Sequence, residues 1–213
     1  MLAIIQAAGW PIYPLLLASV VAVALIIERF ITLRDEKIVP EKLLDQVLQV
    51  FQSQGVTEEV LNKLAQDSPL GQVLAAGLRN YKGSRYVMKD AIEEAGRAVA
   101  HGLERFLTTL GTIATASPLL GLFGTVIGMI EIFGSQSPGG TNPQQLAHGI
   151  SVALYNTAFG IAIAIPALIF YRHFTNKIEG FVVQMEQAAA KLVDIVHGER
   201  LDFQKPGQAP RQG

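Results

Sequence analysis

The chain has 213 residues, of which 50% are hydrophobic and 16% charged, with a formal net charge of −1 and no cysteine. Soluble domains usually carry about 25% charged residues, so this composition argues against one soluble core. The near-neutral charge gives no reason to expect a nucleic-acid partner. The absence of cysteine excludes disulfides, thiol catalysis and cysteine-based metal sites. Charges are nearly absent from 1–27, 106–130 and 132–171, which predicts an all-α integral membrane protein with three transmembrane helices.

The first predicted span runs from about Trp10 to Leu33. Trp10 and Tyr13 open it, as aromatic side chains do at a membrane interface. The start of the chain has no Lys or Arg before its apolar stretch, so we expect no cleaved signal peptide and a retained span. Glu28 and Arg29 are interpreted as an interfacial ion pair, with Arg29 reaching outward to water. Basic residues follow the span, which predicts a periplasmic N-terminus and a cytoplasmic C-terminal end.

Residues 35–105 have an ordinary density of charge and are predicted to form cytoplasmic helices. Pro40 marks one helix start and Gly55 its end, while Ser68 followed by Pro69 is typical of the start of another. A long helix is predicted after Gly83. No strong helix breaker follows, so we expect it to continue unbroken into the second span.

The second span is predicted at 106–133 and the third at 146–171, joined by a loop without Lys or Arg. The third span ends in basic residues, as expected on the cytoplasmic side of a membrane. An amphipathic helix follows over 178–196, and the Pro/Gly-rich end is predicted to be disordered. The predicted organisation is 1–34 for the N-terminus and first span, 35–105 cytoplasmic, 106–133 second span, 134–145 periplasmic loop, 146–171 third span, 172–200 cytoplasmic helix and 201–213 tail.

The second and third spans each carry a face of small residues. At about 100° per residue, Gly111, Ala114, Pro118, Gly121, Thr125 and Gly128 share one side of the second span. Gly149, Ala153, Thr157, Gly160 and Ala164 share one side of the third. Small faces allow close helix approach, and Gly124 with Gly128 forms a GxxxG packing motif. We therefore interpret Gly121, Gly124, Gly128 and Gly160 as helix-packing residues.

Two threonines, Thr125 and Thr157, lie mid-span on these small faces. A lone threonine in a membrane helix usually bonds to its own helix carbonyl, so simple packing is one interpretation. The other is a ring of hydroxyl groups around an axis, formed by several copies of the chain. Such a ring would hydrate a proton path or hydrogen-bond a carboxyl group of a partner.

Pro118 and Pro166 interrupt the second and third spans, where each is either a static kink or a hinge. Glu131 is the acidic residue within the second span, near its outer end. It is either an outer-mouth carboxylate of an ion pathway or a residue that simply faces outer water. No Asp, Glu, Lys or His lies at the centre of any span. A chain that moves protons through a carboxylate would therefore need that group from a partner.

The stretch from Ala116 to Met129, with its core Gly-Leu-Phe-Gly-Thr-Val at 121–126, resembles a signature of the MotA/TolQ/ExbB proton-channel family. The third span resembles the second family block through Gly149-Ile150, Ala153-Leu154, Thr157-Ala158, Gly160 and Ala164-Ile-Pro-Ala167. The three spans and the insertion between the first two match as well. The resemblance covers nearly the whole chain and is strongest to the ExbB type.

The resemblance implies a homopentameric ring around a dimeric partner of the ExbD, TolR or MotB type, whose single span carries an aspartate. Thr125 and Thr157 match pore-facing threonines of the family, and Pro118 and Pro166 match prolines tied to conformational change. The chain departs from the family at Val152, where many members have Glu. This departure argues against a mechanism that needs a Glu at this position of the ring subunit.

The sequence thus predicts an inner-membrane, ExbB-type motor subunit that works with an ExbD-like partner, and possible further contacts are a TonB-like protein and membrane lipids. No nucleotide-binding loop or nucleophile–base constellation is present, so we expect no enzyme activity, cofactor or metal site. Two rivals remain. One is a TolQ-like role in envelope maintenance or a sodium- or proton-driven stator, and the other is a non-conducting membrane scaffold.

Overall fold

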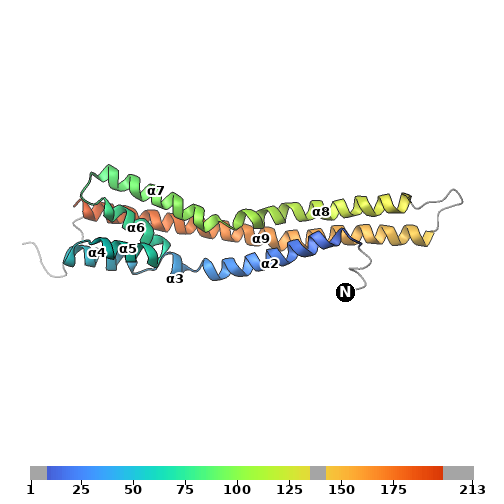
Figure 1. Cartoon of the computed structure of the whole chain (residues 1–213), viewed down its shortest axis with the longest axis horizontal. Helices are drawn as coiled ribbons and strands as arrows, with labels where there is room; N and C mark the ends of the chain where they lie inside the picture. The colour runs from blue at the N-terminus through green and yellow to red at the C-terminus, as the bar shows by residue number, and fades with distance from the viewer. Residues whose placement is uncertain (1–8, 135–142, 199–213) are drawn as a thin grey trace, which may run out of the picture. The chain divides into compact units, whose positions relative to one another are not determined.

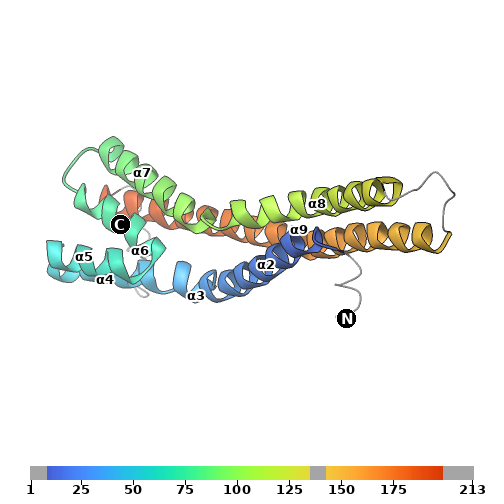
Figure 2. The ribbon, with the colours of Figure 1, turned by 45° about the vertical axis from the view of Figure 1, so that its right-hand side comes forward.

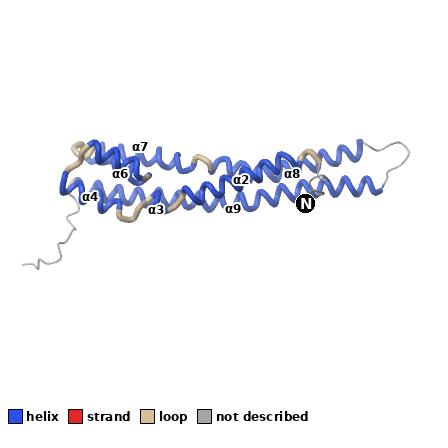
Figure 3. The backbone as a smooth tube through the Cα atoms, turned by 60° about the horizontal axis from the view of Figure 1, so that its bottom comes forward, coloured by secondary structure: helices blue, strands red, loops and turns tan. Residues whose placement is uncertain are grey.

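The structure, a computed structural model, describes residues 9–134 and 143–198, apart from the side chains of Gln54, Gln145 and Val152. All regular secondary structure in these residues is helical (Figures 1 and 3). Within the described ranges, three helices are long and apolar enough to cross a membrane: α2 (Ile12–Thr32), α8 (Leu107–Gly134) and the apolar part of α9 (Pro143–Val196). The predicted tail at 201–213 and most of the predicted loop at 134–145 lie outside the described residues.

The chain divides into two compact units. Unit 1 comprises residues up to Thr32 together with Glu104–Lys177, and unit 2 comprises Leu33–Leu103 together with the residues from Ile178 onward. The three candidate spans therefore belong to unit 1, except for the part of α9 that follows Lys177. The charged insertion and the amphipathic part of α9 belong to unit 2.

Unit 2 begins with four short helices: α3 (Asp35–Ile38), α4 (Leu43–Gln54), α5 (Glu58–Asp67) and α6 (Pro69–Arg79). Their boundaries follow local signals in the sequence. Gly55 ends α4 with a φ of 73°, which costs a glycine little, and Pro69 occupies the first turn of α6. Ser68 is the N-cap of α6 and accepts a hydrogen bond of 3.1 Å from the amide of Gly71. The predicted end of a helix at Gly55 and the predicted start of another at Ser68 are confirmed.

Removal of this cap is expected to destabilise the start of α6. In Ser68→Ala the amide of Gly71 loses its side-chain partner, which costs about 1 kcal/mol of local stability. Hydrogen exchange of the first α6 amides in the detergent-solubilised protein should rise about fivefold. Thr57→Ala is the matched control, since Thr57 is the N-cap of α5 and makes no side-chain cap bond. Equal acceleration in both variants would contradict the assignment.

The remaining helix of unit 2, α7 (Arg85–Glu104), packs with the end of α9. The guanidinium of Arg85 donates a hydrogen bond of 2.8 Å to the carboxylate of Asp194 and forms an ion pair with it. Both helices bury apolar side chains, among them Met88 and Val99 from α7 and Phe181, Met185 and Leu192 from α9. This part of α9 is the amphipathic helix that the sequence predicts.

The prediction of one unbroken helix from Gly83 through the second span is wrong. α7 ends at Glu104 and α8 begins at Leu107, with turn geometry at Arg105 and Phe106. Neither residue is a local helix breaker. Instead, the guanidinium carbons of Arg105 and Arg29 lie 4.9 and 5.1 Å from the centroid of the Phe106 ring. The break therefore coincides with a three-residue cation–π contact made partly by α2, which local propensity cannot reveal.

Candidate functional site

The centre of unit 1 is a close contact between α8 and α9, which run side by side (Figure 1). A Cβ atom placed on Gly160 would lie 2.5 Å from the carbonyl oxygen of Ser117. One placed on Gly121 would lie 2.7 Å from the carbonyl oxygen of Asn156. Both distances are far below an ordinary van der Waals contact, so the two backbones touch where only glycine fits.

The buried face of each helix differs slightly from the small-residue face in the sequence. Between its first turn and Ile132, α8 buries Leu110, Ala114, Ser117, Gly121, Gly124 and Gly128. In the membrane part, α9 buries Ala153, Asn156, Gly160, Ala164 and Ala167. Gly111, Pro118, Thr125, Gly149 and Thr157 are half-buried at the edges of these faces. The expected face of α8 is therefore rotated by about one residue, because Ser117 and Gly124 lie at its centre.

Thr125 and Thr157 lie near each other along the helix pair. A Cβ on Gly121 would be 3.0 Å from the Cα of Thr157, so Thr157 is level with Gly121. Thr125 lies one helical turn beyond Gly121, a rise of about 6 Å. The hydroxyl of Thr125 donates a hydrogen bond of 2.6 Å to the carbonyl of Leu122 and keeps its lone pairs available to a second donor.

Helix α2 covers one side of the α8–α9 pair (Figure 2). The ring of Trp10, just before α2, lies 6.3 Å from that of Phe123 on α8. Phe30 of α2 lies 5.5 Å from Phe170 and 5.1 Å from Phe174 on α9, measured between ring centroids. These contacts place α2 on the side of the pair that carries Phe123 and Phe170.

The two threonines lie on the other side. Thr125 follows Phe123 by two residues, a rotation of about 200° around α8. Phe170 follows Thr157 by thirteen residues, which is about 220° around α9. The face with both hydroxyls is thus turned away from α2, and both threonines are half-buried there. This strip, which we call the threonine face, is the candidate functional site.

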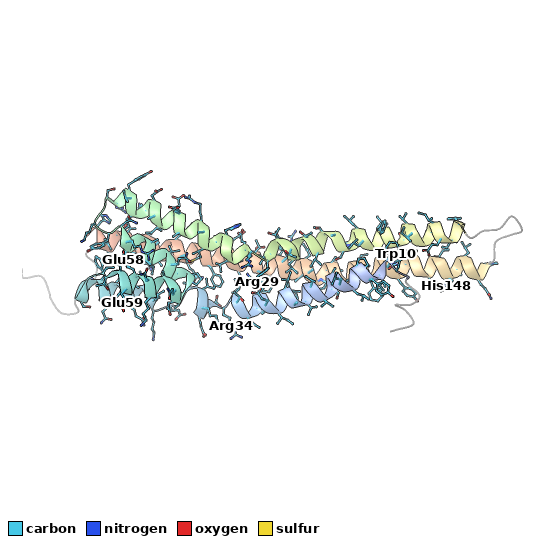
Figure 4. The ribbon with its side chains drawn as sticks, viewed as in Figure 1. Trp10, Arg29, Arg34, Glu58, Glu59 and His148 are labelled. Atoms are coloured by element: carbon cyan, nitrogen blue, oxygen red, sulfur yellow. The ribbon has the colours of Figure 1, made fainter. Side chains whose placement is uncertain are left out.

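The other predicted site residues lie elsewhere. Pro118 and Pro166 are inside α8 and α9, and both helices continue past them. Glu131 is exposed in the last turn of α8, about 240° around the helix from Thr125, so it does not share the threonine face. His148 is exposed near the start of α9 (Figure 4). Among the described residues, no cluster of three His, Asp or Glu side chains could hold a metal ion.

The pairing of Glu28 with Arg29 is confirmed, but the outward course of Arg29 is wrong. The Nη2 atom of Arg29 donates a hydrogen bond of 2.8 Å to the Glu28 carboxylate, which also accepts one of 2.9 Å from Thr32. Arg29 is only 4% exposed, near the end of α2 (Figure 4). Its guanidinium lies over the Phe106 ring, so a contact within unit 1 replaces the contact with water.

Sequence reasoning missed Asn156 and Ser117, which are both 0% exposed. Each sits at the centre of the α8–α9 contact. The signal was present: Asn156 follows Ala153 by three residues and precedes Gly160 by four, which is the spacing of a packed helix face. A polar residue in that register, inside an apolar span, indicates a buried polar group between helices.

Comparison with known proteins agrees with this architecture. Residues 65–187 match the model of the MotA/TolQ/ExbB proton channel family. The putative biopolymer transport protein ExbB-like 3 of Synechocystis is 35% identical over 174 residues, which is 80% of this chain and 83% of that protein. The biopolymer transport protein exbB1 of Vibrio cholerae is 33% identical over 76% of this chain and 74% of its own length.

A third relative carries a different name. The Tol-Pal system protein TolQ of Pseudomonas aeruginosa is 33% identical over 143 residues, which is 62% of this chain and 62% of that protein. The family match spans the end of α5, all of α6, α7 and α8, and most of α9. It therefore includes the residues of the glycine contact and of the threonine face. The chain belongs to the MotA/TolQ/ExbB proton channel family.

Proposed function

We propose that this protein is the ring subunit of an ExbB-type motor in the bacterial inner membrane, driven by the proton-motive force. In this role several copies, five in our proposal, surround the single spans of an ExbD-like partner. The N-terminus lies in the periplasm and unit 2 in the cytoplasm. The motor energises transport across the outer membrane, and a TonB-like protein is the expected recipient of its motion.

The observation that carries this proposal is the threonine face. It is the side of the α8–α9 pair that α2 leaves uncovered, and it presents Thr125 and Thr157 within about one helical turn of each other. Hydroxyl groups both donate and accept hydrogen bonds, so they suit a carboxyl group that gains and loses a proton. Arranged around an axis, these faces would line a path whose walls lack a titrating group.

The missing titrating group defines the partner. No acidic residue lies at the centre of a span, and Val152 stands where many family members have Glu. An aspartate on the partner's span would supply the acid. Across about 150 mV one proton yields roughly 3.5 kcal/mol, enough to break and remake one or two hydrogen bonds to the threonine faces. Protonation would thereby change which subunit the partner prefers.

Reconstitution tests the proposal directly. The protein should co-purify with a partner that has one acidic transmembrane helix, and the complex in liposomes should conduct protons under an imposed potential. The chain alone should conduct at background rate, and so should the complex in which the partner's aspartate is replaced by asparagine. Full conduction by the chain alone would refute the proposal, as would conduction without the partner's acid.

The similarity to TolQ favours one alternative within the family, a role in envelope maintenance. The same complex would then act on a different recipient. Co-purification separates the two roles, since a TolR-like partner would replace the ExbD-like one. Substitution of sodium for protons in the liposome assay tests the sodium-driven stator in the same preparation.

A further inference from the structure

Asn156 fills a notch in α8 at the centre of unit 1. Its side chain lies against Gly124, where an added Cβ would be 2.7 Å from the Asn156 Cβ and 3.1 Å from its Nδ2. The backbone carbonyl oxygen of Asn156 lies over Gly121, one turn earlier on α8. The residue is 0% exposed. One residue of α9 thus occupies the space that two glycines leave open.

A carboxamide is a more specific choice than an apolar side chain in this place. Transfer of an amide into an apolar medium is unfavourable unless its groups are hydrogen-bonded, whereas alanine or leucine would carry no such cost. The size and polarity of Asn156 therefore call for a role that a small apolar residue would not perform.

The position of the notch suggests that role. Thr125 directly follows Gly124 in α8, and Thr157 directly follows Asn156 in α9. A change in the packing of the Asn156 side chain against Gly124 would move the backbones of α8 and α9. These backbones carry the Thr125 and Thr157 hydroxyls. Asn156 itself is buried between the helices and does not belong to the threonine face.

We propose that Asn156 is a positioning residue that sets the spacing between the Thr125 and Thr157 hydroxyls through the fit of its carboxamide against Gly124. This inference rests on the proposed function, because it acts through the threonine face. It adds a residue that governs how the two hydroxyls reach one protonating group, without contact to that group.

The absence of native cysteine allows the spacing to be measured apart from activity. In a Thr125→Cys/Thr157→Cys chain, thiol-specific cross-linkers of graded length report the separation by the length that gives the highest yield. Asn156→Ala should shift that optimum to a shorter linker, and Gly124→Ala to a longer one. The double variant Gly124→Ala/Asn156→Ala should return it toward the original length, because the added methyl group fills part of the space.

Activity is measured with both threonines intact, in the reconstituted complex. Asn156→Ala and the milder Asn156→Ser should lower proton flux about tenfold and shift the pH of half-maximal flux by about one unit, as expected for one weakened hydrogen bond to the titrating group. A purely structural role would lower the amount of assembled protein and leave this pH unchanged. Ser151→Ala is the matched control, since this serine is exposed and its hydroxyl donates to the carbonyl of Ala147 in its own helix.

Failure of the inference is distinguishable from failure of the proposed function. An unchanged cross-linking optimum in Asn156→Ala would overturn the inference, even if Thr157→Val still lowered proton flux. A changed optimum with unchanged flux and pH dependence would overturn it too, whereas the effect of Thr157→Val on flux decides separately on the proposed function. The expected result is a joint change of spacing and pH dependence, reversed in the double variant.

Discussion

Replacement of Thr157 by valine is expected to lower partner-dependent proton flux by about 10- to 100-fold without loss of assembled protein. Valine has nearly the volume of threonine, so the half-buried edge of α9 keeps its packing. The hydroxyl is what disappears. A hydrogen bond to a charged or titrating group contributes about 1.5–3 kcal/mol, which corresponds to that range of rates.

Two variants make this result specific. Thr157→Ser keeps the hydroxyl and should retain most of the flux. Thr112→Val is the matched control on α8, because Thr112 is exposed on the side of α8 opposite Gly121 and its hydroxyl donates to the Thr108 carbonyl. Flux is measured with a pH-sensitive dye in liposomes at equal protein density. Full flux through Thr157→Val would mean that this threonine only packs and takes no part in the proposed proton path.

Replacement of Gly160 by leucine is expected to prevent folding of unit 1, with a loss of more than about 4 kcal/mol. A Cβ at this position would lie 2.5 Å from the Ser117 carbonyl oxygen and 3.1 Å from the Gly121 Cα. All of these neighbours are backbone atoms, so no side-chain rotation relieves the clash. The helices would have to separate, which removes the close packing that membrane helices depend on.

The same helix supplies the control. Gly180 also lies in α9, and a Cβ placed there would meet no atom within 4 Å beyond its chain neighbours and the nearby backbone of its own helix. Gly180→Ala should be neutral or stabilise the helix by about 1 kcal/mol, given the difference in helix propensity. Thermal unfolding of the detergent-solubilised protein and its yield in the membrane fraction compare the two. A stable, abundant Gly160→Leu protein would mean that α8 and α9 do not meet at this glycine.

The helices were largely predictable because their signals are local. Long apolar runs define α2, α8 and the membrane part of α9, and Ser68 and Gly55 mark helix ends within unit 2. The break at Arg105 and Phe106 was not predictable in this way. It coincides with a contact to Arg29, some 75 positions away in the sequence, and such contacts leave no local trace.

The site was predictable in kind but not in detail. Small residues at helical spacing indicate a close helix contact. The same spacing, however, fits several rotations of each helix about its own axis equally well. The observed phase places Ser117, Gly124 and Asn156 at the centre and Thr125 and Thr157 at the edge. Which edge stays uncovered depends on where α2 packs, through Trp10 and Phe30, and that is a property of the folded unit.

The exposed side of α2 has an evolutionary consequence. Leu17, Val20, Val23 and Ile27 are each more than half exposed, so the folded chain constrains their shape little. Selection should therefore act only on their hydrophobicity, and these positions are free to vary among aliphatic residues in related sequences. Gly121 and Gly160, where the backbones of α8 and α9 meet, have no such latitude. A saturation mutagenesis library should therefore lose nearly every substitution at these two glycines while it keeps most apolar exchanges on α2.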